Sequence, residues 1–234
     1  MTFAWPPQIV TAFDKARRSE APLSERLMII AEVVGREFPG FTEIADAFVR
    51  RLDRAKAGDG APRVGEPFPP FLLPDQDGRL VSFEELLDKG PVVAAFVRGH
   101  WCPYCQLNVT ALAEVEDRAS SASAQIVAIS PETQHYSRLL REEAGAKSPF
   151  LTDVGAAFAL SLNLAIWIDR KFSRAIAESG CDVPLYNGTE SWILPIPAVF
   201  VVRRDGIVAA RHIDPDYRKR LEIDWLLRSI REVS

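Results

Sequence analysis

Apolar side chains recur at helical spacing through the first sixty residues. From residue 23 to residue 38 they stand three or four positions apart, at Leu23, Leu27, Ile30, Ala31, Val34 and Phe38. Pro39 and Gly40 end this stripe, and Thr42 is a candidate N-cap for a second helix that reaches Leu52. The pattern predicts an N-terminal helical extension over residues 1–60. Because a short helical pair cannot bury both of its faces alone, we expect it to pack on the rest of the chain, with a dimer contact as the alternative.

From residue 61 to residue 234, short apolar runs alternate with helical patterns. The predicted elements are a hairpin at 71–83, a short helix at 84–89, strands at 92–97, 126–129 and 149–152, helices at 102–120, 132–145 and 156–164, a hairpin at 199–210 and a closing helix at 221–233. Residues 165–192 show no regular pattern. A βαβ unit followed by a helix, a hairpin and a last helix predicts an α/β fold in which a mixed central sheet carries helices on both faces, the thioredoxin-like arrangement.

Composition and charge exclude several classes of protein. The 234 residues are 47% hydrophobic and 26% charged, and the formal net charge is −4. No long run of like charges occurs, so we expect no nucleic-acid partner and no anionic membrane surface. The first residues lack the pattern of a signal peptide, and no apolar run is long enough for a membrane span. We therefore expect a soluble, cytoplasmic protein.

The chemistry of this chain is expected at Trp101-Cys102-Pro103-Tyr104-Cys105, where a predicted buried strand ends and a helix begins. The free N–H groups and dipole of a helix N-terminus stabilise a thiolate, so we expect a lowered pKa for Cys102 at the exposed helix end. Cys105 lies one turn further on and can close a disulfide. We predict that Cys102 is the nucleophile and Cys105 the resolving thiol. Trp101, Pro103 and Tyr104 are candidates for substrate contacts.

Two other interpretations of the cysteine pair are open. A closed zinc site needs four ligands, and the remaining candidates are Cys181, His100, His135 and His212, without a second Cys-x-x-Cys. Two inert buried thiols are the other alternative. We favour redox chemistry, because the motif follows a buried strand in a βαβ context, and we expect no metal and no organic cofactor.

Two residues before the motif are further candidates. Arg98 either stabilises a thiolate or a peroxide oxygen, or it is a surface arginine at the end of a strand. For His100 we expect a solvated loop position.

A proline loop stands before the predicted strand at 199–202. In a thioredoxin-like sheet, Leu194-Pro-Ile-Pro197 occupies the position of a loop that faces the dithiol with a cis X-Pro bond. We expect a cis bond before Pro197, and Ile196 and Pro197 are candidate substrate contacts.

These motifs resemble a known family. Phe96-Val-Arg-Gly-His-Trp-Cys-Pro-Tyr-Cys105, Ala128-Ile-Ser-Pro131, Leu151-Thr-Asp-Val-Gly155 and Asp214-Pro-Asp-Tyr217 are similar to the peroxiredoxin-like branch of the alkyl hydroperoxide reductase/thiol-specific antioxidant (AhpC/TSA) family. The resemblance implies a thioredoxin fold, a peroxidatic role for Cys102, reduction of peroxides with electrons from a thiol donor such as thioredoxin, and a possible homodimer. It also implies that Asp214, Tyr217 and Arg220 form a polar cluster, for which we expect a structural hydrogen-bond network.

The sequence departs from the family pattern near the cysteines. The stretch before Cys102 lacks the usual proline and threonine, and Pro197 stands about where an arginine is expected. Those groups normally polarise the peroxide, so either Arg98 replaces them or peroxidase activity is weak. The primary hypothesis is a thiol peroxidase that forms a Cys102–Cys105 disulfide. A glutaredoxin-like disulfide reductase and a non-catalytic binding module are the alternatives. For Cys181 we expect a spare apolar residue rather than a distal resolving thiol.

Overall fold

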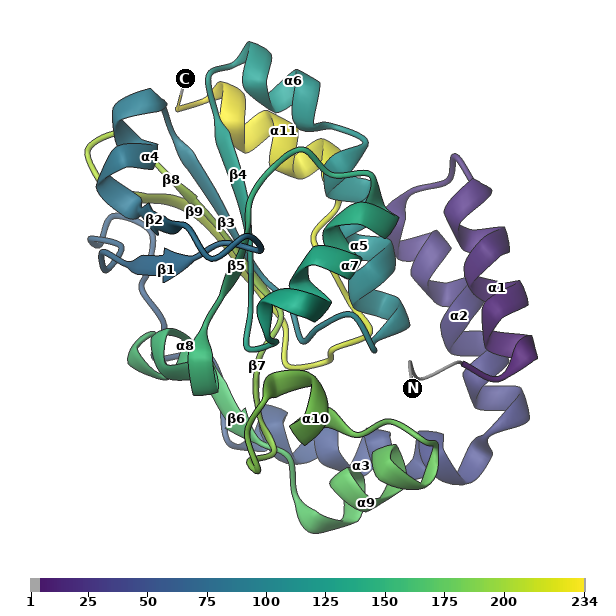
Figure 1. Ribbon diagram of the computed structural model, residues 1–234. Helices are drawn as coiled ribbons and strands as arrows, with labels where there is room; N and C mark the ends of the chain where they lie inside the picture. Colours follow the sequence, from purple (N-terminus) through teal and green to yellow (C-terminus); the bar gives the residue numbers. More distant parts are fainter. Residues whose placement is uncertain (1–4, 234) are drawn as a thin grey trace.

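A five-stranded mixed sheet lies at the centre of the protein. The computed structural model describes residues 5–233. The strand order is β5-β4-β3-β8-β9 (Figure 1). The strands are β3 Val92–Phe96, β4 Gln125–Ser130, β5 Phe150–Thr152, β8 Ala198–Val202 and β9 Val208–Ile213. β3, β4 and β5 run parallel, whereas β8 is antiparallel to β3 and β9 to β8. This is the predicted mixed sheet.

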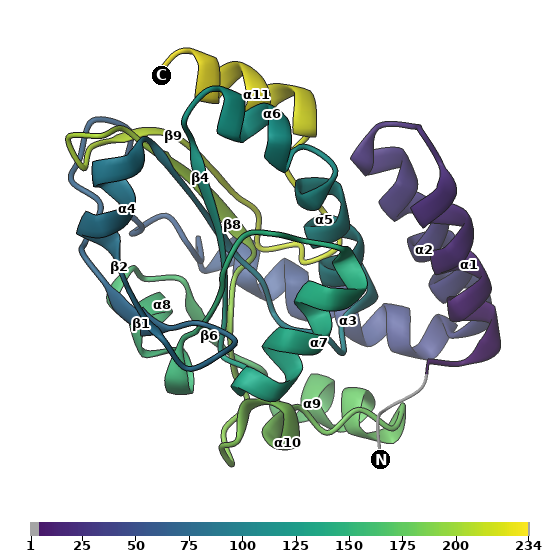
Figure 2. The same cartoon turned by 45° about the horizontal axis from the view of Figure 1, so that its top comes forward.

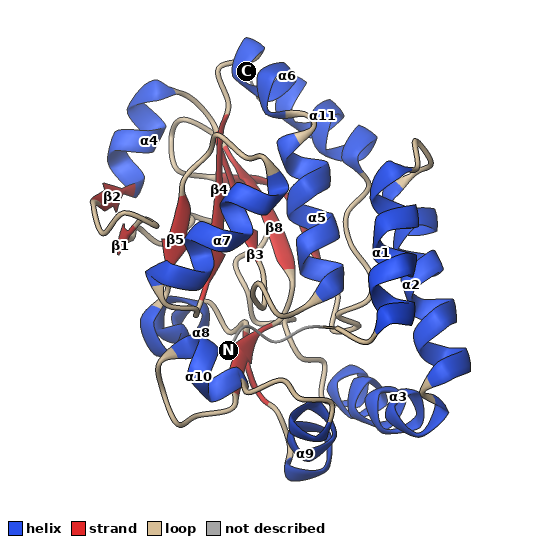
Figure 3. Ribbon diagram, turned by 45° about the vertical axis from the view of Figure 1, so that its right-hand side comes forward, coloured by secondary structure: helices blue, strands red, loops and turns tan. Residues whose placement is uncertain are grey.

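Helices cover both faces of the sheet, as predicted (Figure 3). The surrounding elements are the hairpin of β1 Leu72–Pro74 and β2 Leu80–Ser82, and the helices α4 Phe83–Lys89, α5 Pro103–Ala113, α6 Glu116–Ser121, α7 Gln134–Ala144, α8 Ala157–Ser161 and α11 Ile223–Arg231. Alternate residues of β3 point to opposite faces. Ala94 and Phe96 join a core cluster with α4 and α8, and Val93 and Ala95 join one with α6 and α11. The strand is therefore buried throughout, which explains its continuous apolar sequence.

Two stretches differ from the sequence prediction. The helix expected over 102–120 is interrupted between α5 and α6 near Val115. The stretch 165–192, which showed no regular pattern, contains β6 Ala165–Trp167, α9 Arg170–Glu178 and α10 Val183–Asn187, and β6 pairs with β7 Ile193–Pro195. Both helices begin at an aspartate whose side chain accepts a backbone N–H, Asp169 for α9 and Asp182 for α10. Those two N-caps are the local signals that the hydrophobic pattern missed.

The N-terminal segment packs on the sheet domain as expected. It forms α1 Pro7–Arg18, α2 Leu23–Glu37 and α3 Pro39–Arg54, with α1 and α2 side by side next to α5 (Figures 1 and 2). The buried Arg26 donates hydrogen bonds to the carbonyl of Ala16 and to Glu114. In the other direction, the backbone N–H groups of Leu23 and Ser24 at the start of α2 donate hydrogen bonds to the Glu222 carboxylate. The helices thus share their apolar faces with the main domain, although the division of the chain at residue 60 remains a prediction.

One predicted cap in this segment is wrong. Thr42 does not cap α3, because that helix already begins at Pro39, and the Thr42 hydroxyl donates to the carbonyl of Phe38 from inside the first turn. The first helix ends before Pro39 as predicted, and because a proline at the first helical position loses no hydrogen bond, Pro39 also starts α3. None of the described helices combines the length and the hydropathy that a bilayer span requires.

Candidate active site

The dithiol lies where the sequence predicts, at the start of α5. Cys102 is the N-cap residue, Pro103 takes the first helical position, and the N–H of Cys105 donates to the carbonyl of Cys102 at 3.0 Å. Cys102, Cys105 and Cys181 are all free thiols. The two thiols of the motif hydrogen-bond to each other. Helix geometry therefore brings the two sulfurs together one turn apart.

The expected exposure of Cys102 is wrong. Its exposed fraction is 1%, and that of Cys105 is 0%. The reason is that α1 and α2 pack on α5, while α3 and α9 complete the wall of the cavity beside Cys102. Cys102 nevertheless lines a cavity of about 630 Å³, whereas Cys105 is not among the residues that line it. Small molecules in the cavity thus meet Cys102 first.

The lowered pKa belongs to Cys105 rather than to Cys102. Burial raises the pKa of Cys102 well above its ordinary value, and its hydrogen bond to Cys105 raises it further. Burial also acts to raise the pKa of Cys105, but the hydrogen bond from Cys102 and the charges of Arg220 and Arg98 lower it well below the ordinary value. The Cys105 sulfur accepts from Nη2 of Arg220 at 3.2 Å and from the backbone N–H of Arg98 at 3.3 Å. The donors and cations around the dithiol therefore favour a negative charge on the inner sulfur over one on Cys102.

Arg98 is buried and faces the cavity, which excludes the surface-arginine alternative. Its side chain is held between two rings, with the guanidinium carbon 4.6 Å from the centroid of Trp101 and 4.1 Å from that of Tyr217. The residue is 3% exposed, and within residues 5–233 its Nε has no hydrogen-bond partner and no carboxylate pairs with it. Stacking on two aromatic faces favours the cation there. Its unused N–H donors remain available to a ligand oxygen.

His100 is buried, which corrects the expected solvated position. Its backbone N–H donates to Oε2 of Glu132 at 2.7 Å, and its Nε2 lies 3.0 Å from Oε2 of Glu143. Glu132 is fully buried, and burial raises its pKa well above the ordinary value. Gly99 adopts φ +141°, and a Cβ there would collide with the Glu132 carboxyl. Glu132 and Gly99 together hold the loop that leads into Cys102.

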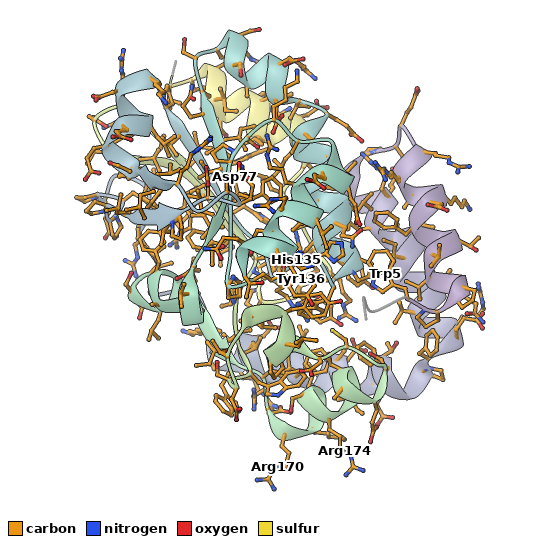
Figure 4. The ribbon with its side chains drawn as sticks, viewed as in Figure 1. Trp5, Asp77, His135, Tyr136, Arg170 and Arg174 are labelled. Atoms are coloured by element: carbon orange, nitrogen blue, oxygen red, sulfur yellow. The ribbon has the colours of Figure 1, made fainter. Side chains whose placement is uncertain are left out.

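Not all predicted contact residues meet at the cavity. Trp101, Pro103 and Tyr104 line it together with Cys102 and Arg98. Trp5 lies beside this loop (Figure 4), and its Nε1 donates to the carbonyl of Trp101 at 2.9 Å.

Ile196 and Pro197 lie away from the cavity lining. The prediction of a cis bond before Pro197 is wrong, since no peptide bond within residues 5–233 is cis. The side chain of Ile196 is fully buried in the core cluster on the other side of the sheet, and its N–H donates to the carbonyl of Leu164. Because β7 is tied to β6 just before this point, the loop is drawn towards that pair of strands.

The remaining sequence predictions concern Cys181 and a metal site. Cys181 is 2% exposed and lines the cavity, and burial raises its pKa to about 12. In the part of the chain that the structure describes, no group of three or more His, Cys, Asp or Glu side chains could hold a metal ion.

Two functional candidates come from the segment after the last strand. Tyr217 lines the cavity, and Arg220 binds the Cys105 sulfur across 115 positions of sequence. Within the expected cluster, Arg220 also donates to the carbonyl of Tyr217, so these two residues belong to the dithiol site. The resemblance in Asp214-Pro-Asp-Tyr217 was the available signal, but no local pattern connects it to the cysteines.

Comparison with known proteins identifies the family of this chain. The model of the AhpC/TSA family matches residues 64–211, which is more than half of the chain. The chain belongs to the AhpC/TSA family. Membership makes this AhpC/TSA protein an oxidoreductase of the thiol peroxidase type. None of the curated proteins compared with it gave a match.

Solved structures share the fold of this AhpC/TSA protein. Peroxidoxin BcpB from Mycobacterium tuberculosis is 19% identical with a TM-score of 0.58, and the alignment covers 74% of this chain and 99% of that one. A cysteine-to-serine mutant of peroxiredoxin 6 of Arenicola marina is 18% identical with a TM-score of 0.56, covering 72% and 71%. A putative protein disulfide isomerase from Bacteroides thetaiotaomicron is 17% identical with a TM-score of 0.52, covering 74% and 90%. Helices α1–α3 and Arg220 lie outside the family match.

Proposed function

We propose that this AhpC/TSA protein reduces hydroperoxides with Cys102 as the peroxidatic thiol and Cys105 as the resolving thiol. The observation that carries the proposal is the shared cavity: Cys102 and the unpaired guanidinium of Arg98 both line it, while Cys105 lies behind. A nucleophile and a cation are thus presented to one small molecule. Arg98 takes the place of the family groups that are missing before Cys102.

The first step is attack on the peroxide. The Cys102 thiol passes its proton along the hydrogen bond to the Cys105 thiolate and becomes a thiolate itself. This sulfur attacks the terminal oxygen of R–O–O–H, so that an S–O bond forms, the O–O bond breaks and RO⁻ leaves. Arg98 stabilises the charge that develops on the leaving oxygen. RO⁻ takes the proton from the Cys105 thiol to give the alcohol, or water when R is hydrogen, so that Cys105 is a thiolate again and Cys102 is a sulfenic acid.

The second step uses the charge held by Arg220. The Cys105 thiolate attacks the Cys102 sulfenic acid, the disulfide forms and hydroxide leaves as water after protonation. An external dithiol of the thioredoxin type then reduces the disulfide by exchange. The sum is one hydroperoxide and one dithiol converted to an alcohol, a water molecule and a disulfide. These steps need only thiols and the peroxide as reactants.

A disulfide reductase is the second candidate, because the two cysteines already lie one helical turn apart and can exchange with a substrate disulfide. Stopped-flow oxidation of the reduced protein separates the two. Rapid reaction with a hydroperoxide, followed by loss of two thiols per chain, supports the peroxidase. Reaction with a small disulfide and none with hydroperoxides supports the reductase, and inertness to both supports a binding module.

A further inference from the structure

The cavity beside Cys102 is much larger than hydrogen peroxide requires. Its volume of about 630 Å³ falls in the range of pockets for drug-sized ligands, whereas one water molecule occupies only about 30 Å³ of liquid. A two-oxygen substrate would leave most of this space unfilled. The size therefore indicates a substrate with a substantial organic group.

Elements outside the family match build most of the apolar wall. These side chains come from α1, the end of α2, α3 and α9, and they are Ile9, Val34, Phe38, Phe41, Ile44 and Ile176. Of these elements, only α9 lies within the family match. Cys102, Trp101 and Tyr217 line the same cavity. The helical extension thus supplies most of the apolar wall of the cavity beside the dithiol.

One buried cation stands in this apolar site with two aromatic partners but, within residues 5–233, no carboxylate partner. Arg98 is enclosed, has an unpaired Nε and lines the cavity next to Cys102. The carboxylate on the lining, Glu178, is already paired with Arg174 on the outer side of α9 at 2.7 Å (Figure 4). A buried donor without an acceptor is costly. The site consequently fits a ligand with an oxygen at one end and an apolar body at the other.

We infer that the preferred substrates are hydroperoxides with a bulky apolar organic group, whose peroxide oxygens meet Cys102 and Arg98 and whose organic group fills the cavity formed by α1–α3 and α9. This inference rests on the proposed function and narrows its substrate class. The reaction is the one given above: the terminal peroxide oxygen is transferred to Cys102, and the bulky alcohol leaves the cavity. Hydrogen peroxide lacks the group that gains free energy from apolar burial.

The test compares single-turnover oxidation by cumene hydroperoxide and by hydrogen peroxide. The ratio of the two rate constants is divided by the same ratio for free glutathione, which removes intrinsic reactivity. We expect a corrected preference for cumene hydroperoxide of at least roughly tenfold, equivalent to about 1.4 kcal/mol. A corrected ratio near one overturns the inference and leaves the proposed function standing. Inertness towards both hydroperoxides refutes the proposed function as well.

A matched pair on α9 places the effect in the cavity. Ala175 lines the cavity and Ala177 on the same helix is exposed and does not. Ala175→Phe should lower the rate with cumene hydroperoxide at least roughly tenfold more than the rate with hydrogen peroxide, whereas Ala177→Phe should change neither. An equal loss with both substrates, or no loss, in a folded Ala175→Phe protein contradicts the inference.

A second pair of variants tests the inference independently if Ala175→Phe does not fold. Gly40 lines the cavity and Gly35 does not, and a Cβ at either position meets nothing within 4 Å. Gly40→Phe should reduce the preference for cumene hydroperoxide, and Gly35→Phe should preserve it. The same preference in both variants overturns the inference.

Discussion

Removal of the Arg220 guanidinium tests whether the inner sulfur carries the charge. Nη2 of Arg220 lies 3.2 Å from the Cys105 sulfur, and both residues are buried, at 7% and 0% exposure. At an effective dielectric constant of about 20, two unit charges at this separation attract by about 5 kcal/mol. Even if the surroundings replace two thirds of that energy, the remaining ~1.7 kcal/mol changes the ratio of thiolate to thiol more than tenfold. Arg220→Gln should therefore raise the pKa of Cys105 markedly.

The assay follows thiolate absorbance in the ultraviolet as a function of pH. The chain has three cysteines, so Cys102→Ser and Cys181→Ser leave Cys105 as its single thiol. In this background, Arg220→Gln should move the titration midpoint to higher pH, and Arg220→Lys should restore part of the shift because it keeps a cation. Arg228→Gln, at an exposed position on α11, is the matched control and should leave the midpoint in place.

Stability provides a second measurement of the same contact. Because the folded pKa of Cys105 lies below the unfolded one, ionisation stabilises the fold at pH values above the unfolded pKa, and this contribution is lost as the pH falls through the folded pKa. The stability difference between the parent and Arg220→Gln should therefore shrink on acidification. An unmoved midpoint in Arg220→Gln, or an equal shift in Arg228→Gln, would refute the assignment of the charge to Cys105.

Four further predictions concern the site and its support. Cys102→Ser should abolish peroxide turnover, whereas Cys105→Ser should accumulate a sulfenic acid or mixed disulfide, detectable by mass spectrometry; continued turnover without Cys102 contradicts the assignment. Burial raises the folded pKa of Glu132, so its stabilising contribution is present below the unfolded pKa and is lost as the pH rises through the folded pKa. In urea titrations at increasing pH, the free energy of unfolding should therefore fall less for Glu132→Gln than for the parent. An identical pH profile argues against this role. Phe172→Ala removes a fully buried ring that packs against Phe41, Phe48 and Tyr217, and should lower the free energy of unfolding by about 3–5 kcal/mol; a loss below about 1 kcal/mol would be too small for a core ring. Arg26→Ala should cost about 1–3 kcal/mol by removing the buried guanidinium that donates to the carbonyl of Ala16 and pairs with Glu114, and unchanged protease resistance of α1 and α2 would count against that contact.

Local sequence pattern was sufficient for the elements that place the cysteines. The continuous apolar run of β3 needs cover on both faces, and the motif that follows it has a proline at the first helical position, so strand, turn and helix are set by neighbours in sequence. The family, the mixed sheet and the one-turn spacing of Cys102 and Cys105 followed from these residues. The one-turn spacing depends on a few neighbouring residues, the mixed sheet on the order of the elements along the chain, and the family on a resemblance carried by motifs between residues 96 and 217.

The tertiary structure alone decided the electrostatics and the shape of the site. Helix position by itself predicted an exposed, ionised Cys102, but the packing of α1–α3 and α9 buries that sulfur, and Arg220, 115 residues beyond Cys105, transfers the charge to the inner one. Desolvation and Coulomb energy depend on distance in space rather than on distance along the chain. For the same reason the apolar cavity, the buried His100 and the buried Glu132 had no signature in the sequence that surrounds them.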